Sequence, residues 1–248
     1  MSTRLAERGV RLALLDIEGT TTPLAFVHDI LFPFAGARLA AWLAGNDSTA
    51  DYGRLVSMLQ SEREPDEKAG ETLPTWSTRT DAECLASVQA YLEWLMARDR
   101  KSPALKLVQG WIWEAGYQAG ELHGEIFPDV APALRRWRTE GVVVAIYSSG
   151  SELAQRRLFA STGHGDLTPL IAGFFDTAVG PKLSASSYRR IADAMGCPPG
   201  AAMFISDVAG ELQAAQEAGC RVILSIRPGN AEQPDPDRFE RFSTFEAL

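Results

Sequence analysis

The chain has 248 residues, of which 46% are hydrophobic and 23% charged, which predicts a globular protein with one large domain or one core plus an insert. Its formal net charge of -8 at pH 7, without any long basic run, argues against nucleic acid or an anionic membrane as a partner. The three cysteines form no Cys-x-x-Cys pair and no metal-ligand spacing with the three histidines, so we expect reduced thiols.

The start of the chain is charged at Arg4, Glu7, Arg8 and Arg11, and its apolar run is too short for a signal peptide or a membrane span. We therefore expect a cytoplasmic protein. Within this start, Val10–Asp16 (VRLALLD) is a short apolar run followed by a polar turn, and it predicts a buried strand.

Between Leu24 and Gly124 the sequence has helical patterns and no convincing strand. The polar stretch Ser61–Thr78 is expected to be a connection. This region predicts an all-helical domain at residues 24–124, inserted into a core made of residues 1–23 and 125–248. The helical patterns are Gly36–Gly45, Asp81–Asp99 and Ala104–Gly120.

Strand and helix patterns alternate after the insert, which is typical of βαβ units. The fold class expected is therefore α/β, with a Rossmann-like, doubly wound parallel sheet. A Pro-rich loop at Arg227–Phe239 follows. The expected strands are Val142–Gly150, Phe174–Val179 (short), Ala201–Asp207 and Arg221–Ile226, and the expected helices are Ser151–Thr162, Ser184–Gly196 and Ala209–Gly219.

Polar residues stand where three of these strands end. Ligands of an open parallel sheet bind outside the carboxyl ends of its strands, so these side chains should share one crevice. Lys182, in a loop before a helix, would join them. The strand-end residues are Asp16 and Glu18, then Ser148, Ser149 and Gly150, then Ser206 and Asp207.

Such a set suits phosphoryl transfer. The carboxylates can hold Mg²⁺, a hard cation that prefers oxygen ligands, and Lys182 can offset phosphate charge. Ser149, Gly150 and the helix start after them can donate hydrogen bonds to phosphate oxygens. Asp16 can attack phosphorus to give an aspartyl-phosphate, while Glu18 protonates the leaving oxygen and then activates water.

Four motifs in this order, DIEGTTTP, YSSGS, PKLSASSY and ISDVAGEL, resemble those of the haloacid-dehalogenase-like hydrolases. Glu18 replaces the second Asp of the usual Asp-x-Asp-x-Thr motif. With that departure, Asp16–Ala35 is similar to the acireductone synthase family, the enolase-phosphatases of methionine salvage. Similarity extends over almost the whole chain, through Lys101–Tyr117, Phe127–Arg138 and Arg227–Ala231.

This resemblance implies roles for individual residues. Asp16 and Glu18 match the family's nucleophile and acid/base positions, and with Asp207 its magnesium site. Ser148 and Ser149 match its substrate-phosphate site, and Lys182 its motif lysine, although GPK stands where some relatives have HK. The implied reaction enolises 2,3-diketo-5-methylthiopentyl-1-phosphate and then removes its phosphate. The implied fold is a Rossmann-like core with a helical cap.

Simpler interpretations of the same residues are also open. Asp16 and Glu18 fit a turn, Asp207 an N-cap, and Lys182 a solvated side chain. Ser149 and Glu152 fit a Ser-x-x-Glu capping box, which is compatible with phosphate binding.

Two rival functions fit the same fold: a phosphatase acting on another small organophosphate, and a non-catalytic binding protein. His28 either faces the cleft or packs in the core of the insert. The base for enolisation stays open, with Glu18 a candidate, and a monomer is expected.

Overall fold

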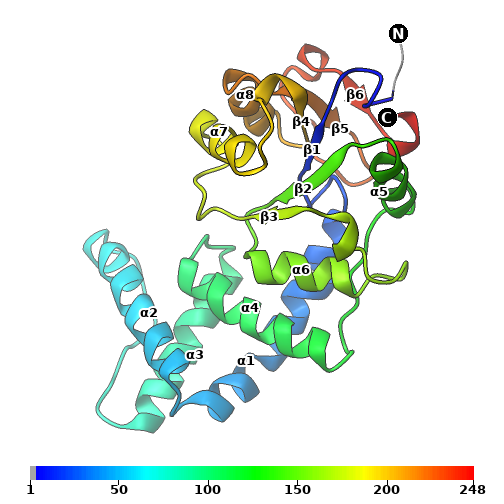
Figure 1. The fold of residues 1–248 in the computed structure, drawn as a ribbon. Coiled ribbons are helices and arrows are strands. Elements are labelled where there is room, and N and C mark those ends of the chain that lie inside the picture. Colours follow the sequence, from blue (N-terminus) through cyan, green and yellow to red (C-terminus); the bar gives the residue numbers. More distant parts are fainter. Residues whose placement is uncertain (1–3) are drawn as a thin grey trace. The chain divides into compact units, whose positions relative to one another are not determined.

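The computed structural model describes residues 4–248, which divide into two compact units (Figure 1). One unit comprises the described residues up to His28 together with Gly120–Leu248, and the other is Asp29–Ala119. The first unit carries the sheet, and the second is entirely helical apart from its connections. The role of the helical unit as a cap stays a prediction.

The sheet unit contains six parallel strands in the order β3-β2-β1-β4-β5-β6. The α/β fold class predicted from the sequence is confirmed. Two details of the prediction were wrong. The sixth strand was not anticipated, and Asp176–Val179 forms a turn, in which the Asp176 carboxylate accepts the Ala178 amide at 2.8 Å. The strands are β1 Leu12–Leu15, β2 Val143–Tyr147, β3 Gly173–Phe175, β4 Ala202–Ser206, β5 Arg221–Ser225 and β6 Arg241–Phe242.

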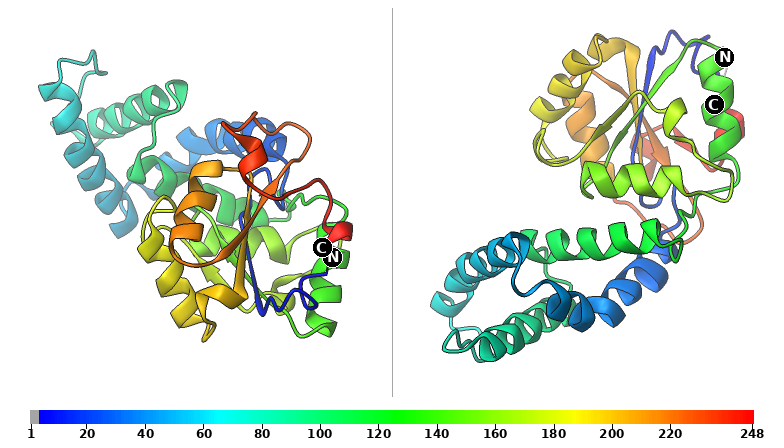
Figure 2. Two further views of the ribbon diagram at one scale, coloured as in Figure 1. Left: turned by 90° about the horizontal axis from the view of Figure 1, so that it is seen from above. Right: turned by 60° about the horizontal axis from the view of Figure 1, so that its bottom comes forward.

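Helices cover both faces of this sheet, which explains why β1 is apolar throughout and β4 is apolar up to its last residue, Ser206. Figure 1 shows α7 and α8 on one side of the strands and α5 on the other, and the right-hand view of Figure 2 shows the sheet between helices. Leu12 and Leu14 of β1 pack toward α7 and α8 in one buried cluster. The helices are α5 Val130–Thr139, α6 Glu152–Ala160, α7 Ala185–Ala194 and α8 Ala209–Glu217.

The chain order reverses between β1 and β4. From β1 the sheet grows through β2 to β3 on one side, and from β4 through β5 to β6 on the other. Leu15 pairs with both Ile146 and Ile205, so the strand ends of β2, β1 and β4 are level. The topology therefore opens a crevice at the carboxyl ends of β1 and β4, where open α/β sheets bind their ligands.

The helical unit consists of α1 Phe32–Asn46, α2 Ala50–Lys68, α3 Asp81–Ala97 and α4 Pro103–Gln118. The polar connection predicted at Ser61–Thr78 is wrong for its first part, because α2 continues through Ser61–Lys68. Its polar side chains find partners there: Arg63 pairs with Glu67 at 2.7 Å and Asp66 with Arg100 at 2.5 Å. Composition alone did not reveal these partners.

One helical stretch, Phe26–Asn46, is long and apolar enough to cross a membrane by length and composition alone. Three of its residues, Ala35, Leu39 and Leu43, recur at four-residue spacing and pack into the core of the helical unit. The stretch begins with a π-helical segment, Phe26–Leu31. His28 in this segment is exposed, so the interpretation of His28 as a core histidine was wrong.

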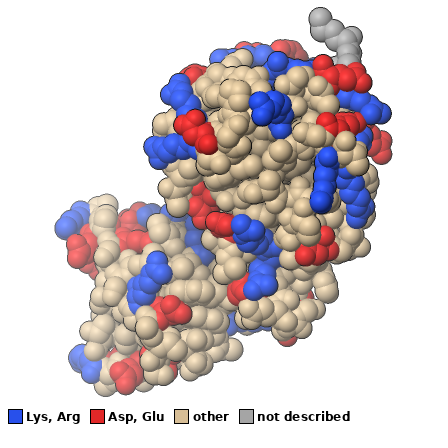
Figure 3. All heavy atoms as spheres, viewed as in Figure 1, with Lys and Arg blue, Asp and Glu red and all other residues tan. Residues whose placement is uncertain are grey.

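Charged side chains are mixed on the face drawn in Figure 3, where acidic and basic groups lie among one another on both units. No large basic area stands out on that face.

Candidate active site

Asp16 is the first residue after β1, at the crevice. Its amide donates to the carbonyl of Ile205, which continues the β1–β4 ladder by one residue. The residue is 4% exposed. The Oδ1 atom accepts the Ile17 amide at 2.8 Å and lies 2.7 Å from the Lys182 ammonium. The carboxylate is therefore held in one orientation by the backbone and by a cation.

Lys182 pairs with a second acid as well. Its Nζ lies 2.6 Å from Oε2 of Glu211, which stands in the first turn of α8. Ser206 Oγ lies 2.9 Å from the same Glu211 oxygen and 3.2 Å from Oδ2 of Asp16. One ammonium and one hydroxyl thus bridge two carboxylates across the ends of β1 and β4.

The cluster contains more carboxylates than cations, and this imbalance changes the pKa values of its members. Burial acts to lower the pKa of Lys182, but the charges of Asp16 and Glu211 outweigh it and raise that pKa, so Lys182 is a cation at neutral pH. Burial raises the pKa of Asp207 to about 7, and the charges of Asp16 and Glu211 add to this. Burial, and after it the negative charge of Asp16, raises the pKa of Glu211 to about 6. A single Lys does not neutralise three acids.

Asp207 approaches the turn after β1 very closely. Gly19 has a φ of +67°, and a Cβ built on it would stand 2.3 Å from Oδ2 of Asp207 and 2.8 Å from Oδ1 of Asn230. Only glycine fits there, both for its backbone conformation and for the space. The Asn230 oxygen is shielded from solvent and has no hydrogen-bond partner within residues 4–248.

These oxygens fit a hard divalent cation. Carboxylate and amide oxygens are its preferred ligands, and it would satisfy both the excess charge and the unpaired acceptor. Within residues 4–248 no three or more His, Cys, Asp or Glu side chains are grouped so that they could hold a metal ion by themselves, and this includes Asp16, Glu18 and Asp207. Bound Mg²⁺ usually keeps several waters, so two carboxylates with other oxygens suffice. The assignment of Asp16, Glu18 and Asp207 as ligands stays a prediction.

Glu18 lies in the same turn, half-buried, and its backbone bridges with Thr22. The turn is tightly bonded: the amides of Thr20, Thr21 and Thr22 all donate to the carbonyl of Ile17. The positive φ of Gly19 explains why a glycine stands in this turn. The acid/base role of Glu18 remains a prediction.

Ser148 and Ser149 follow β2. The Ser148 side chain is buried and its Oγ accepts the Gly150 amide at 3.3 Å, whereas Ser149 is exposed. The predicted Ser149–Glu152 capping box was wrong, because α6 begins two residues later than that box requires. Its N-cap is Ser151, whose hydroxyl accepts the Ala154 amide at 3.3 Å. Ser149 therefore stands before the helix start, outside its cap.

Sequence reasoning missed Glu211 and Asn230. Glu211 stands four residues after Asp207, in the quoted stretch ISDVAGEL, where α8 turns it back toward the strand end. That spacing was the available signal. Asn230 comes from the Pro-rich tail, 211 positions from Gly19, and no local pattern connects the two.

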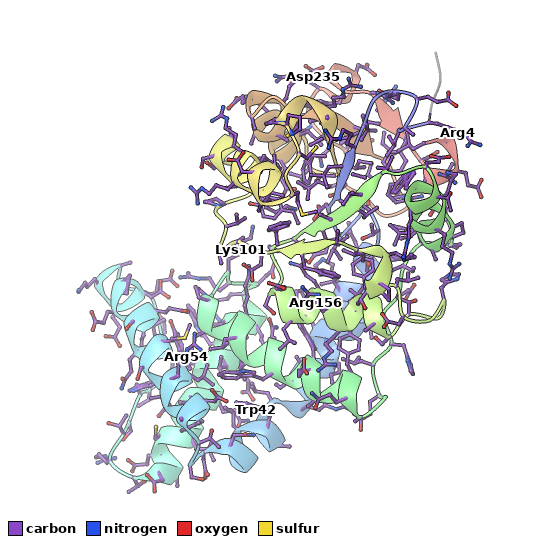
Figure 4. All side chains as sticks on the ribbon, in the orientation of Figure 1. Arg4, Trp42, Arg54, Lys101, Arg156 and Asp235 are labelled. Atoms are coloured by element: carbon purple, nitrogen blue, oxygen red, sulfur yellow. The ribbon has the colours of Figure 1, made fainter. Side chains whose placement is uncertain are left out.

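Two hollows of the sheet unit lie elsewhere. One of about 120 Å³ is lined by Arg11, Leu12, Gly141, Val143, Met195, Gly196 and Cys197, at the amino ends of the strands. The other, about 310 Å³, is lined by residues of α6 and Thr168, with Arg156 (labelled in Figure 4) on its wall. Neither is lined by an acid of the site.

Comparison with known proteins gives consistent matches. The sequence pattern of haloacid dehalogenase-like hydrolases matches residues 10–219. Enolase-phosphatase E1 of Synechococcus elongatus is 45% identical over 218 residues, which cover 88% of this chain and 89% of that protein. Enolase-phosphatase E1 of Danio rerio is 41% identical, covering 92% and 89%. The crystal structure of the UTR4 protein of Saccharomyces cerevisiae matches with a TM-score of 0.74 at 29% identity, covering 96% and 100%.

Proposed function

Because the chain belongs to the haloacid dehalogenase-like hydrolases, and within them to the enolase-phosphatase E1 family, we propose that it enolises 2,3-diketo-5-methylthiopentyl-1-phosphate and removes its phosphate. The chain is a phosphatase by this membership. The product would be the acireductone 1,2-dihydroxy-3-keto-5-methylthiopentene, formed in methionine salvage. The observation that carries the proposal is the Asp16–Lys182–Glu211 cluster at the crevice.

Phosphate removal would begin at Asp16. One of its carboxylate oxygens attacks phosphorus while Glu18 protonates the departing enolate oxygen, which breaks the substrate's P–O bond and leaves an aspartyl-phosphate. Glu18 then takes a proton from water, which attacks phosphorus and regenerates Asp16. The buried carboxylate of Asp16 supports this role, because Lys182 and the Ile17 amide fix its orientation.

The transferring phosphoryl group needs positive charge and hydrogen-bond donors around it. Lys182 supplies the protein's charge, and Ser148, Ser149 and the Gly150 amide are the donors that we assign to the phosphate. Asp16, Glu18 and Asp207 would hold Mg²⁺, which would offset the negative charge of the phosphoryl group. The excess of carboxylates over Lys182 supports this requirement.

Enolisation requires a base that removes a proton next to a carbonyl. Glu18 is our candidate, since it is half-buried beside the nucleophile and already moves protons in the second step. Glu18→Gln should then enolise the diketone much more slowly than the wild type. A normal enolisation rate in this variant would remove Glu18 as the base.

An anaerobic incubation with the diketo phosphate and Mg²⁺ tests the proposal, with enol absorbance and free phosphate followed together. We expect both signals to rise, and both to be lost on chelation. Phosphate without an enol would favour a phosphatase of the same superfamily with another substrate. Neither signal, with this substrate or with a panel of phosphate esters, would favour a non-catalytic binding protein.

The setting proposed for this reaction is the cytoplasm, with a small phosphate ester as substrate and no nucleic acid, membrane or obligatory partner subunit. The net charge of -8 supports the absence of nucleic acid and of anionic membranes as partners. Sedimentation of the purified protein at micromolar concentration should give a mass near 27.0 kDa. A mass twice as large would contradict the expected monomer.

A further inference from the structure

The turn that carries Glu18 is held by Ser225, the last residue of β5, and by Asn230 in the segment that follows β5. The carbonyl oxygen of Gly19 accepts two side-chain hydrogen bonds, one from Ser225 Oγ at 3.0 Å and one from Asn230 Nδ2 at 2.9 Å. Asn230 Nδ2 also donates to the carbonyl of Ser225 at 3.2 Å. Both protons of the Asn230 amide nitrogen are therefore used on backbone carbonyls.

These two bonds fix which way the amide group of Asn230 points. Rotating it by 180° would place its oxygen against two carbonyl oxygens, so the observed orientation is the favourable one. The oxygen Oδ1 consequently points away from them. It is shielded from solvent, and the described part of the chain offers it no hydrogen-bond donor. A buried acceptor in this condition is unfavourable unless something else satisfies it.

The Asn230 oxygen and the Asp207 carboxylate lie against the same side of Gly19. The point where a Cβ of residue 19 would stand is 2.8 Å from Asn230 Oδ1 and 2.3 Å from Asp207 Oδ2. Both oxygens are acceptors, so neither can satisfy the other, and a cation or a donor within reach of both would satisfy them. The nearby ammonium of Lys182 is engaged elsewhere, on Asp16 and Glu211.

We propose that Asn230 is a further oxygen ligand of the divalent-cation site, acting directly or through one water beside Asp207. Amide oxygens are ordinary ligands of hard cations, and a bound cation would satisfy Oδ1 and offset the charge of Asp207. This inference rests on the magnesium dependence of the proposed function. The Asn230 side chain would then have two tasks. Its nitrogen would donate to the turn, and its oxygen would bind the cation.

Calorimetric titration of the substrate-free protein with Mg²⁺ tests the assignment. Asn230→Ala should weaken the affinity about 10- to 100-fold, the usual effect of losing a supporting ligand. Ser225→Ala is the matched control, because it also removes a donor to the Gly19 carbonyl but leaves the Asn230 oxygen in place. Its Mg²⁺ affinity should stay within about threefold of the wild type, because only one neutral hydrogen bond to the turn is lost.

A second measurement uses the wild type and does not depend on a variant that folds. The chain has two asparagines, Asn46 and Asn230. With ¹³C,¹⁵N-labelled Asn, addition of Mg²⁺ should move the side-chain signal of Asn230 and leave that of Asn46, whose amide donates to Trp42 in the helical unit, unchanged.

The outcomes separate this inference from the proposed function. If the wild type binds Mg²⁺ but Asn230→Ala and Ser225→Ala lose the same affinity, Asn230 only holds the turn and the inference is overturned. An Asn230 signal that ignores saturating Mg²⁺ overturns it as well. If the wild type binds no Mg²⁺ at all, the magnesium dependence fails together with the inference.

Discussion

At the scale of single residues, the site is a group of buried acids around one Lys. Asp16 and Glu211 share the Lys182 ammonium, and Asp207 lies against the glycine turn. Buried charges of this kind contribute little net stability, because desolvation offsets their attraction. Their value is that the carboxylate of Asp16 is already oriented before substrate arrives.

Removing the shared cation should be costly. Lys182→Met leaves two buried carboxylates without a cation and should lower the free energy of unfolding by about 3–5 kcal/mol. Adding Glu211→Gln removes one of these charges, so the double variant should lose less than the sum of the two single losses. Urea unfolding of the four proteins measures this.

An exposed ion pair provides the control for that cycle. Arg79 pairs with Glu83 at 3.1 Å on the surface of the helical unit, and Arg79→Met should cost about 1 kcal/mol or less. If Lys182→Met costs no more than Arg79→Met, the cluster around Lys182 does not exist as described.

Gly19 offers a second test with a built-in comparison. Gly19→Ala and Gly9→Ala both place a side chain at positive φ, which costs roughly 1–2 kcal/mol each. Only at Gly19 would the new methyl collide with Asp207, whereas Gly9 has open space. We therefore expect Gly19→Ala to lose Mg²⁺ affinity and phosphatase activity, and Gly9→Ala to keep both. Equal activity in the two variants would contradict the close approach of Asp207.

At the scale of elements, the start of α6 separates two serines that look alike in the sequence. Ser151 caps the helix, while Ser149 stands before it and is exposed. Sequence reasoning gave Ser149 both tasks. The structure assigns the cap to Ser151, because the extended backbone of residue 151 is followed directly by helical residues.

Substitution of Ser151 should therefore affect stability, and substitution of Ser149 should affect catalysis. Ser151→Ala should lower the free energy of unfolding by about 1 kcal/mol with little change in kcat/KM. Ser149→Ala should unfold like the wild type but lose roughly 10-fold in kcat/KM, the effect of one hydrogen bond to a charged group. Thermal unfolding and steady-state phosphate release would be measured on both. Reversed results would return the capping role to Ser149.

The sequence predicted most elements for one reason: their apolar patterns are local. β1, β2, β4 and β5 follow apolar runs, and α3, α4, α7 and α8 follow helical spacing. The errors arose where partners are distant. The polar end of α2 is supported by the pair of Asp66 with Arg100, which is distant in the sequence, and β6 is too short to show a pattern before it joins β5.

At the scale of the whole molecule, the parallel topology explains why residues far apart in the chain meet. Asp16 and Asp207 directly follow the neighbouring strands β1 and β4. Their proximity could therefore be predicted from the sequence, once the two strands were recognised. Glu211 and Asn230 required the structure. Glu211 was signalled only by its spacing from Asp207, and Asn230 reaches Gly19 from the segment after β5, to which no local pattern connects it.

The central claim is that one site at this edge transfers phosphate through Asp16. The most direct measurement compares phosphate release from the diketo phosphate by the wild type and by Asp16→Asn, anaerobically and with Mg²⁺. We predict steady release by the wild type and a loss on the order of 10³-fold or more in Asp16→Asn, since the amide is no nucleophile. Comparable release by a folded Asp16→Asn protein would contradict the account.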